Sequence, residues 1–203
     1  LAAVMRKIKC EKYSLIEYIS PLQEFEIQGE RGVLVHKVDF DLVRGAHPDV
    51  VVYDRHWNSK AFDYVKNYLS RGSLVFLALP GLSCHSAIDA FLACADDRNL
   101  AIRLLQDNLI TAINQRVMIG SNLDRISATE ILIGTPQVRS LLEQNQWAQI
   151  TEIMKTTGDK TGMRTLNQSL LQLLIRRKVE IKVAFETSVD PEELDNLLSK
   201  VGI

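Results

Sequence analysis

A chain of 203 residues with 46% hydrophobic and 24% charged content is apolar enough to fold, with room for one sizeable domain and a small appendage. Its 24 basic residues nearly balance its 25 acidic residues, so a net charge of -1 excludes a global basic field that collects nucleic acid or anionic lipid. No apolar run approaches the roughly 18 to 20 residues that cross a bilayer. We therefore expect a cytoplasmic protein with no direct membrane insertion.

Four short apolar runs in the first half predict β-strands, at Tyr13 to Ile19, Val33 to Val35, Asp49 to Tyr53 and Ser73 to Leu79. The last two are nearly unbroken in apolar character, which is typical of strands covered on both faces of a parallel sheet. Between them, apolar residues recur every three or four positions over Ser59 to Ser70. This spacing predicts a helix, and hence a right-handed strand-helix-strand crossover.

From Ser83 onward the apolar residues recur at helical intervals. One predicted helical face contains Ala87, Phe91 and Cys94, and a second runs through Ile102, Leu105, Leu109 and Ile113. After the turn signal at residues 120–122, the segment from Arg125 to Ile133 is predicted to return as a strand pair.

The C-terminal third predicts a helical bundle. Thr135-Pro136 and Asp190-Pro191 each combine an N-cap residue with proline at the first helical position, and Glu193 is placed to close a capping box. The predicted helices are Pro136 to Asn145, Trp147 to Thr156, Met163 to Arg177, Val179 to Glu186 and Pro191 to Val201.

Cysteine and histidine spacing gives no sign of a metal site. The three cysteines are widely spaced, which suits a reducing compartment, and the four histidines show no HxxxH or HExxH pattern. Cys84 and His85 are adjacent, but neighbours along a chain seldom face each other as nucleophile and base. Reduced, buried thiols are therefore expected.

Four sequence blocks follow the order and spacing of one known family. Leu109 to Gln115 looks like its LRGVIAQ helix, Ile126 to Arg139 like RVAAHEILVNTPAVR, Gly162 to Leu170 like GMQTLDQSL, and Asp190 to Leu194 like DPEEL. The family is that of the PilT-type pilus-retraction ATPases, relatives of the type II and type IV secretion motors.

The resemblance implies an α/β fold, with a RecA-like, mostly parallel sheet flanked by helices and a C-terminal helical bundle. It assigns residues 1–134 to the RecA-like core, as the portion that follows the phosphate loop, and residues 135–203 to the helical subdomain. It also implies a part in a type IV pilus, in twitching motility or in secretion.

Three positions at which this family does chemistry hold other residues here. Ile19-Ser20-Pro21 falls on the acidic Glu-Asp-Pro box, so Ser20 replaces a carboxylate. Arg55 falls on the glutamate that prepares the attacking water and helps to hold magnesium, and a guanidinium can do neither. Pro80 stands where the family has a histidine near the γ-phosphate, and it offers no donor. The comparison therefore implies no catalytic residue and no metal ligand.

Two polar residues form a candidate residual site. The resemblance implies that Arg44 is what remains of the family's arginine-rich segment. Asp54 follows a predicted strand at its carboxyl end, where open α/β sheets bind ligands. The other interpretation of Asp54 is a solvated loop carboxylate. Glu17 and Asp49 are the further acidic groups that a shifted alignment would bring to the site.

The GxxxxGK[ST] phosphate loop is missing between Leu1 and Ile203. We therefore expect a degenerate motor subunit, a pseudo-ATPase with no cofactor and a structural or regulatory role. The alternative is a fragment of an active retraction motor that uses ATP and magnesium, because Leu1 to Met5 looks like the helix that directly follows the loop. A third hypothesis is a binding module unrelated to pili that reuses the fold. Whether the chain is an enzyme stays open at this point.

The resemblance also implies partners: a homo- or hetero-hexameric ring with motor subunits, at an inner-membrane pilus or secretion platform, and no nucleic acid. Trp57, Trp147 and the basic run Arg176-Arg177-Lys178 are candidates for a seam between subunits. The alternative for the basic run is a solvated helix end.

Overall fold

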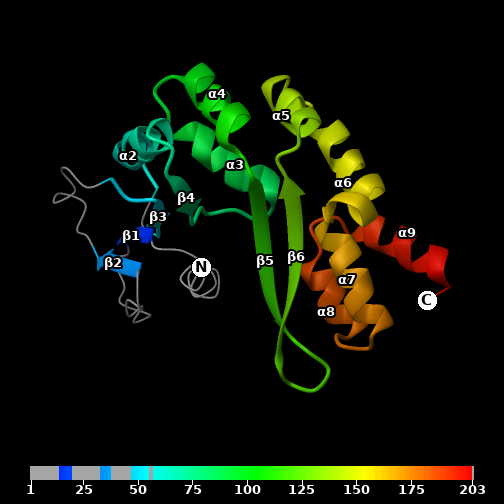
Figure 1. Ribbon diagram of the computed structural model, residues 1–203. Coiled ribbons are helices and arrows are strands. Elements are labelled where there is room, and N and C mark those ends of the chain that lie inside the picture. The colour runs from blue at the N-terminus through cyan, green and yellow to red at the C-terminus, as the bar shows by residue number, and fades with distance from the viewer. Residues whose placement is uncertain (1–13, 20–32, 38–46, 55–56, 203) are drawn as a thin grey trace. The chain divides into compact units, whose positions relative to one another are not determined.

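A computed structural model describes residues 14–19, 33–37, 47–54 and 57–202. This part of the chain contains six strands and eight helices (Figure 1), which confirms the predicted α/β class. Contacts group the chain into two compact units. Unit 1 comprises residues 1–80 and 91–98, and unit 2 comprises residues 81–90 and 99–203. The predicted domain division after residue 134 stays a prediction.

Unit 1 contains a parallel sheet in the order β2, β1, β3, β4. The strands are β1 (Ser14–Ile19), β2 (Val33–Lys37), β3 (Val50–Tyr53) and β4 (Leu74–Leu77), one for each predicted run. All four residues of β3 are buried, as predicted for a strand covered on both faces. The same prediction is wrong for β4, which is half-buried or exposed, because it is the end strand of the described sheet and has fewer neighbours.

Helix α2 (Ser59–Ser70) has the predicted bounds and connects the parallel strands β3 and β4. Asn58 begins it, because its side chain accepts a hydrogen bond from the backbone N–H of Ala61 at 3.0 Å. After the helix ends, Gly72 adopts a φ of 84°, which glycine tolerates without strain. A buried cluster on the sheet consists of Ile16, Tyr18, Val50 and Val52, with Phe76 packed against it.

Aromatic rings form a second buried group in unit 1. Trp57 is only 6% exposed and stacks on Phe91, with ring centroids 5.5 Å apart and an interplanar angle of 18°. Phe62 of α2 contacts both rings edge-on or tilted, at 6.4 and 5.3 Å. These contacts join α2 to the C-terminal end of α3 (Cys84–Ala93).

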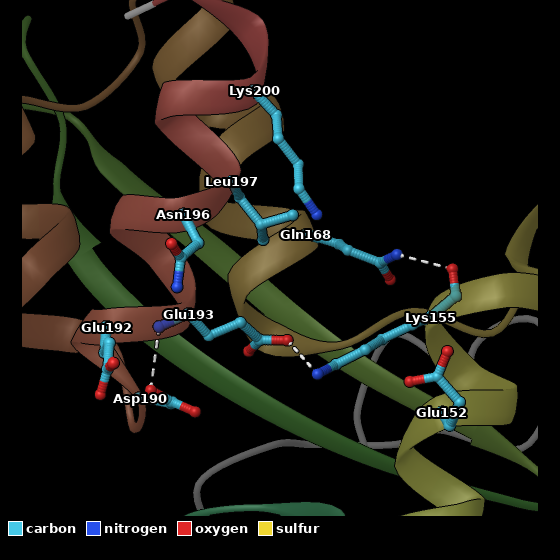
Figure 2. A pocket seen from close by; sticks show the side chains of 9 residues that line it. All are labelled: Glu152, Lys155, Gln168, Asp190, Glu192, Glu193, Asn196, Leu197 and Lys200. Carbon is cyan, nitrogen blue, oxygen red and sulfur yellow. Dashed lines mark hydrogen bonds and ion pairs between the residues drawn. The ribbon is translucent and has the colours of Figure 1, made fainter.

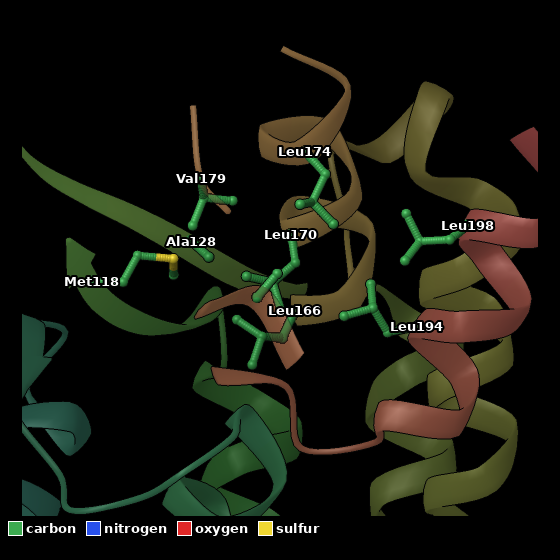
Figure 3. Packing of buried hydrophobic residues seen from close by; sticks show 9 residues of the cluster. Met118, Ala128, Leu166, Leu170, Leu174, Val179, Leu194 and Leu198 are labelled. Carbon is green, nitrogen blue, oxygen red and sulfur yellow. The ribbon is translucent and has the colours of Figure 1, made fainter. Parts of the chain in front are cut away.

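Unit 2 is built on an antiparallel hairpin of β5 (Thr111–Ile119) and β6 (Arg125–Ile133). Helix α7 (Leu166–Ile175) packs along β6, and α8 (Ile181–Thr187) and α9 (Pro191–Val201) pack on α7. Figure 3 shows the core between them, which consists of Met118, Ala128, Leu166, Leu170, Leu174, Val179, Ala184, Leu194 and Leu198.

Unit 2 also contains α3 up to residue 90. Its other helices are α4 (Arg98–Asn108), whose first residue belongs to unit 1, α5 (Pro136–Glu143) and α6 (Trp147–Thr161). Both predicted proline starts are confirmed. The Thr135 side chain accepts from the N–H of Val138 at 3.3 Å, and that of Asp190 accepts from the N–H of Glu193 at 3.0 Å.

The guanidinium of Arg139 fixes the corner where α4, β5, β6 and α5 meet. It donates to the backbone oxygens of Gly134, Gln106 and Leu109, each at 2.8 Å, and to that of Asp107 at 3.1 Å. Two of these carbonyls belong to the last turn of α4, where a helix leaves carbonyls without partners of its own.

The prediction of a helix over Leu109 to Gln115 is wrong, because Thr111–Ile119 is strand β5. Exposed and covered residues alternate along it, and Ile113 is 59% exposed instead of completing a helical face. In this segment β-branched residues and polar residues alternate with period two, which a search for helical spacing passes over. Cys94 likewise lies just beyond the end of α3, at Ala93.

The predicted capping box at Glu193 does not form as expected, since the Glu193 carboxylate bonds to Lys155 and Asn167. A capping box forms instead at Thr165 and Gln168, at the start of α7. Among the helices of the described part, none has both the length and the apolar character to cross a membrane.

Candidate functional site

The carboxyl ends of three parallel strands meet at one edge of the sheet in unit 1. Ile19 of β1 pairs with Tyr53 of β3, and Tyr53 pairs with Leu77 of β4, so the three strands end level with one another. The backbone N–H of Ala78 continues the ladder by donating to the oxygen of Tyr53 at 3.0 Å. This edge is where ligands bind in open α/β sheets.

The positions singled out in the sequence follow these strand ends. Ser20 directly follows β1 and Arg55 comes two residues after β3, but both lie outside the described residues, as does Arg44. Pro80 is described: it is exposed and lies three residues beyond the end of β4.

Asp54 is the carboxylate that the structure places at this edge. It is half-buried and follows β3 directly, and its backbone N–H donates to the oxygen of Ile19 at 2.8 Å. Its Oδ2 lies 3.4 Å from the hydroxyl of Tyr18, which donates to it. A carboxylate held this way at the end of a strand can accept a proton or contact a cation.

Glu17 is a buried carboxylate within β1 and not at its end. It is 1% exposed, and its Oε2 accepts a hydrogen bond from the hydroxyl of Tyr64 in α2 at 3.2 Å. Burial raises the pKa of Tyr64, and the negative charge of Glu17 adds to that rise. The geometry is that of an internal tether between strand and helix, and sequence reasoning had no pattern that distinguished it from a site residue.

Asp49 lies at the opposite edge of the sheet. It precedes β3, and its Oδ2 accepts from the backbone N–H of Leu15 at 2.9 Å. Of the three acidic residues that a shifted alignment offered, Asp54 is therefore the one located where the fold binds ligands.

Unit 2 contains an open polar groove between α6 and α9 (Figure 2), with a volume of about 670 Å³. That volume suits a small molecule, but such sites are mostly apolar, whereas charged side chains dominate this lining. Lys155 and Glu193 form an ion pair across it at 2.5 Å, and the hydrogen bond that Lys155 donates to Glu193 raises the pKa of Lys155. The groove is lined by Glu152, Lys155, Gln168, Asp190, Glu192, Glu193, Asn196, Leu197 and Lys200.

Asn167 lies behind this groove and organises it. The side chain is 1% exposed, and its Nδ2 donates to the backbone oxygen of Asp190 at 2.8 Å and to Oε2 of Glu193 at 2.7 Å. Its Oδ1 accepts from the hydroxyl of Ser188 at 2.7 Å. The network joins α7 to the start of α9, which indicates a structural role for the groove's charged residues.

Cys84 and His85 do not form a nucleophile and base pair. Burial raises the pKa of the Cys84 thiol to about 12, and its Sγ donates to the backbone oxygen of Ala112 at 3.3 Å. His85 instead stacks on Trp147, with ring centroids 3.9 Å apart, and its Nε2 lies 3.2 Å from Asp89.

The residues considered for a subunit seam differ in exposure. Trp57 is buried in the aromatic group of unit 1, so the prediction that it contacts another subunit at a seam is wrong. Trp147 is half-buried against His85, and the basic run Arg176 to Lys178 is exposed at the end of α7. Across the residues with described placement, no group of three or more His, Cys, Asp or Glu is arranged to hold a metal ion.

Comparisons with known proteins point to pilus motors. No protein-family model matches the chain. It is 26% identical to the type IV pilus retractation ATPase PilT of Pseudomonas aeruginosa over 147 residues. The aligned residues are 71% of this chain and 42% of that protein. It is 28% identical over 133 residues to a twitching motility protein of Neisseria gonorrhoeae, covering 64% of this chain and 35% of that protein.

The fold agrees with these similarities. The crystal structure of the pilus retraction motor PilT with bound ADP superposes with a TM-score of 0.83 at 21% identity, over 96% of this chain and 58% of that one. The predicted resemblance to PilT-like motor ATPases and the predicted fold are both confirmed. The chain spans less than half the length of the two curated relatives.

Proposed function

We propose that this chain, a relative of the PilT-like motor ATPases, is a degenerate motor subunit that does not hydrolyse ATP. Its role would be structural or regulatory, within type IV pilus or secretion machinery. The sequence and the fold both support the motor ancestry, because the similarity covers 71% of the chain and the superposition 96%. The loss of hydrolysis is the step that the proposal adds.

One observation carries this step: the chemical positions that follow the three level strand ends hold Ser20, Arg55 and Pro80. Phosphoryl transfer depends on positioned metal, water and charge, so each of these positions needs a carboxylate or a titratable ring. Serine, arginine and proline supply none of these groups. Packing positions around the same edge are retained, since β3 is fully buried.

Asp54 supports the alternative, an active retraction motor whose phosphate loop lies upstream. It stands at the carboxyl end of β3, and the hydroxyl of Tyr18 donates to its carboxylate at 3.4 Å. In such a motor Asp54 would take over the placement of water and magnesium, and ATP would be the cofactor. The two proposals therefore differ in whether removal of the Asp54 carboxylate abolishes an ATPase activity.

The test is a magnesium-ATP titration of the full-length protein by calorimetry, paired with an assay for phosphate release. We expect no saturable heat near micromolar concentrations and no release above background. A binding isotherm together with hydrolysis that Asp54→Asn abolishes would reject the degenerate subunit. Asp49→Asn is the matched control, because it removes a carboxylate from the opposite edge of the same strand.

We also propose that the subunit associates with other motor subunits in a ring. The exposed basic run Arg176-Arg177-Lys178 supports a charged seam. Sedimentation velocity over a range of concentrations and salt tests this, and we expect weak, concentration-dependent association. Sedimentation as a monomer at every concentration, both alone and with an intact motor, would contradict it.

A further inference from the structure

The chain enters unit 2 through a short segment that the β5–β6 hairpin holds in place. Unit 1 contains Pro80 and unit 2 begins at Gly81, so the four residues from Gly81 to Cys84 are the first of unit 2 and lead into α3. A connection of this kind usually has the freedom of a surface loop. Here most of its hydrogen-bonding groups are occupied.

Four residues of the hairpin make these bonds, and we call them the hairpin clamp: Ala112, Asn114, Arg116 and Glu130. Asn114 Nδ2 donates to the oxygen of Gly81 at 2.9 Å, and Arg116 Nη2 donates to the oxygen of Leu82 at 3.2 Å. The backbone N–H of Cys84 donates to Oε2 of Glu130 at 2.7 Å. The Cys84 thiol donates to the oxygen of Ala112 at 3.3 Å.

Strand register explains why these side chains act together. Asn114 and Glu130 are directly paired across the hairpin, and Ala112 and Arg116 are two residues away from Asn114 on β5. Residues two apart on a strand point to the same face. One face of the hairpin thus presents two donors and one carboxylate to the same segment, and the backbone oxygen of Ala112 adds a fourth contact.

Glu130 acts as a cap supplied by a distant part of the chain. The first N–H groups of a helix have no partner within the helix and carry partial positive charge, which favours a carboxylate beside them. Cys84 is the first residue of α3, and its N–H bonds to Glu130, which is 46 residues further on. The clamp therefore fixes both the segment and the start of the helix.

The segment itself has little freedom. Ser86 Oγ accepts from the N–H groups of Leu82 and Ser83 at 2.8 and 2.9 Å. A Cβ added to Gly81 would lie 2.8 Å from the backbone nitrogen of Ala87, closer than real Cβ contacts come. Proline at position 80 has a fixed φ of its own.

We propose that the hairpin clamp is a positioning device, which makes the segment from Gly81 to Cys84 move as one body with the β5–β6 hairpin. A displacement of Pro80, which comes three residues after the end of β4, is then passed along the chain to the hairpin and is not absorbed by a flexible loop. Glu130 is the central positioning residue. The inference holds with or without ATP hydrolysis, so it goes beyond the proposed function.

The reactivity of the Cys84 thiol tests the clamp, because this side chain is 1% exposed and is itself part of the contact. In full-length protein in which Cys84 is the only cysteine, thiol labelling is timed in native buffer and in denaturant. We expect slow native labelling. Glu130→Ala should speed it roughly ten- to a hundredfold, the range expected when a bond to a charged acceptor is lost. Glu130→Gln keeps an acceptor oxygen and should label within a few-fold of wild type.

Two controls separate the clamp from a general loss of stability. Leu174→Ala removes packing in the hydrophobic core of the same unit, and Glu186→Ala removes an exposed carboxylate of α8. At low denaturant we expect neither control to raise the labelling rate of the Cys84 thiol. Asn114→Ala and Arg116→Ala should each raise that rate. Labelling that is no faster in Glu130→Ala than in Leu174→Ala would overturn the proposal. Hydrogen exchange gives a second measurement, since amides 81–84 should exchange with the hairpin in wild type and earlier in Glu130→Ala.

Discussion

The substitution Asn167→Asp tests the network behind the polar groove most directly. The related motif GMQTLDQSL has aspartate at this position, so the sequence alone predicts a harmless change. In this chain Nδ2 of Asn167 donates to two oxygens, at 2.7 and 2.8 Å, and the side chain is 1% exposed. An aspartate cannot donate to either oxygen and would place a second carboxylate against that of Glu193.

The expected cost follows from these contacts. Losing a hydrogen bond to a charged acceptor costs about 1.5 to 3 kcal/mol, and a bond to a neutral carbonyl about 1 kcal/mol. With two like charges in contact and partly shielded from water, we expect a total of roughly 3 to 5 kcal/mol in the free energy of unfolding. The loss should shrink at acidic pH, where a protonated carboxyl can donate again.

Urea denaturation followed by circular dichroism, at pH 7 and pH 4, measures this loss. Asn167→Ala removes the donors without adding charge, so the difference between the two variants isolates the repulsion. Asn196→Asp makes the same chemical change at an exposed position of α9 and should stay within about 0.5 kcal/mol of wild type. A loss below about 1 kcal/mol for Asn167→Asp at pH 7 would refute the reasoning.

Three further predictions concern single contacts in unit 2. Burial raises the pKa of Glu130, so its ionisation opposes folding. The stability of wild type relative to Glu130→Gln should therefore fall as the pH rises above the usual titration range of a glutamate. Urea midpoints measured at acidic and neutral pH check the sign, and a rising difference contradicts it. Gly134→Ala should lower the free energy of unfolding by several kcal/mol, because the new Cβ would lie 2.0 Å from the backbone oxygen of Leu109. A thermal melt measures the loss. Gly72→Asn is the control, because residue 72 has a left-handed backbone and open space around its Cβ position. Thr165→Ala removes the N-cap of α7 and should cost about 1 kcal/mol in chemical denaturation, whereas Thr165→Ser should retain most of that stability.

Local chemistry made much of the fold predictable. Helix α2 has the predicted bounds because its helical apolar spacing stops at the same residues as its start and stop signals. Helices α5 and α9 begin where threonine or aspartate precedes proline. The strand β5 was predicted as a helix because the resemblance was followed in place of the period-two alternation around Ile113. The local pattern does not predict a side chain's partner elsewhere in the chain, as for Glu193, which bonds to Lys155 and Asn167 instead of closing a capping box.

The candidate site was only partly predictable. The position of Asp54 follows from strand order, since a residue after a buried parallel strand lies at the carboxyl edge. Glu17 and Asp49 could not be told apart from it in the sequence, because what excludes them is a tyrosine from α2 and a backbone N–H of β1. The hairpin clamp could not be predicted from the sequence for the same reason, because the residues that it joins are more than 25 positions apart.

The Arg139 corner makes one joint of unit 2 depend on a single side chain. Its guanidinium is a rigid planar fork that donates to four backbone oxygens, two in the last turn of α4 and two just before and just after the hairpin. Lysine would offer a single ammonium on a flexible stem, unable to reach all four. A substitution at this one position should therefore leave several carbonyls without a donor at once and loosen the junction of α4 with β5.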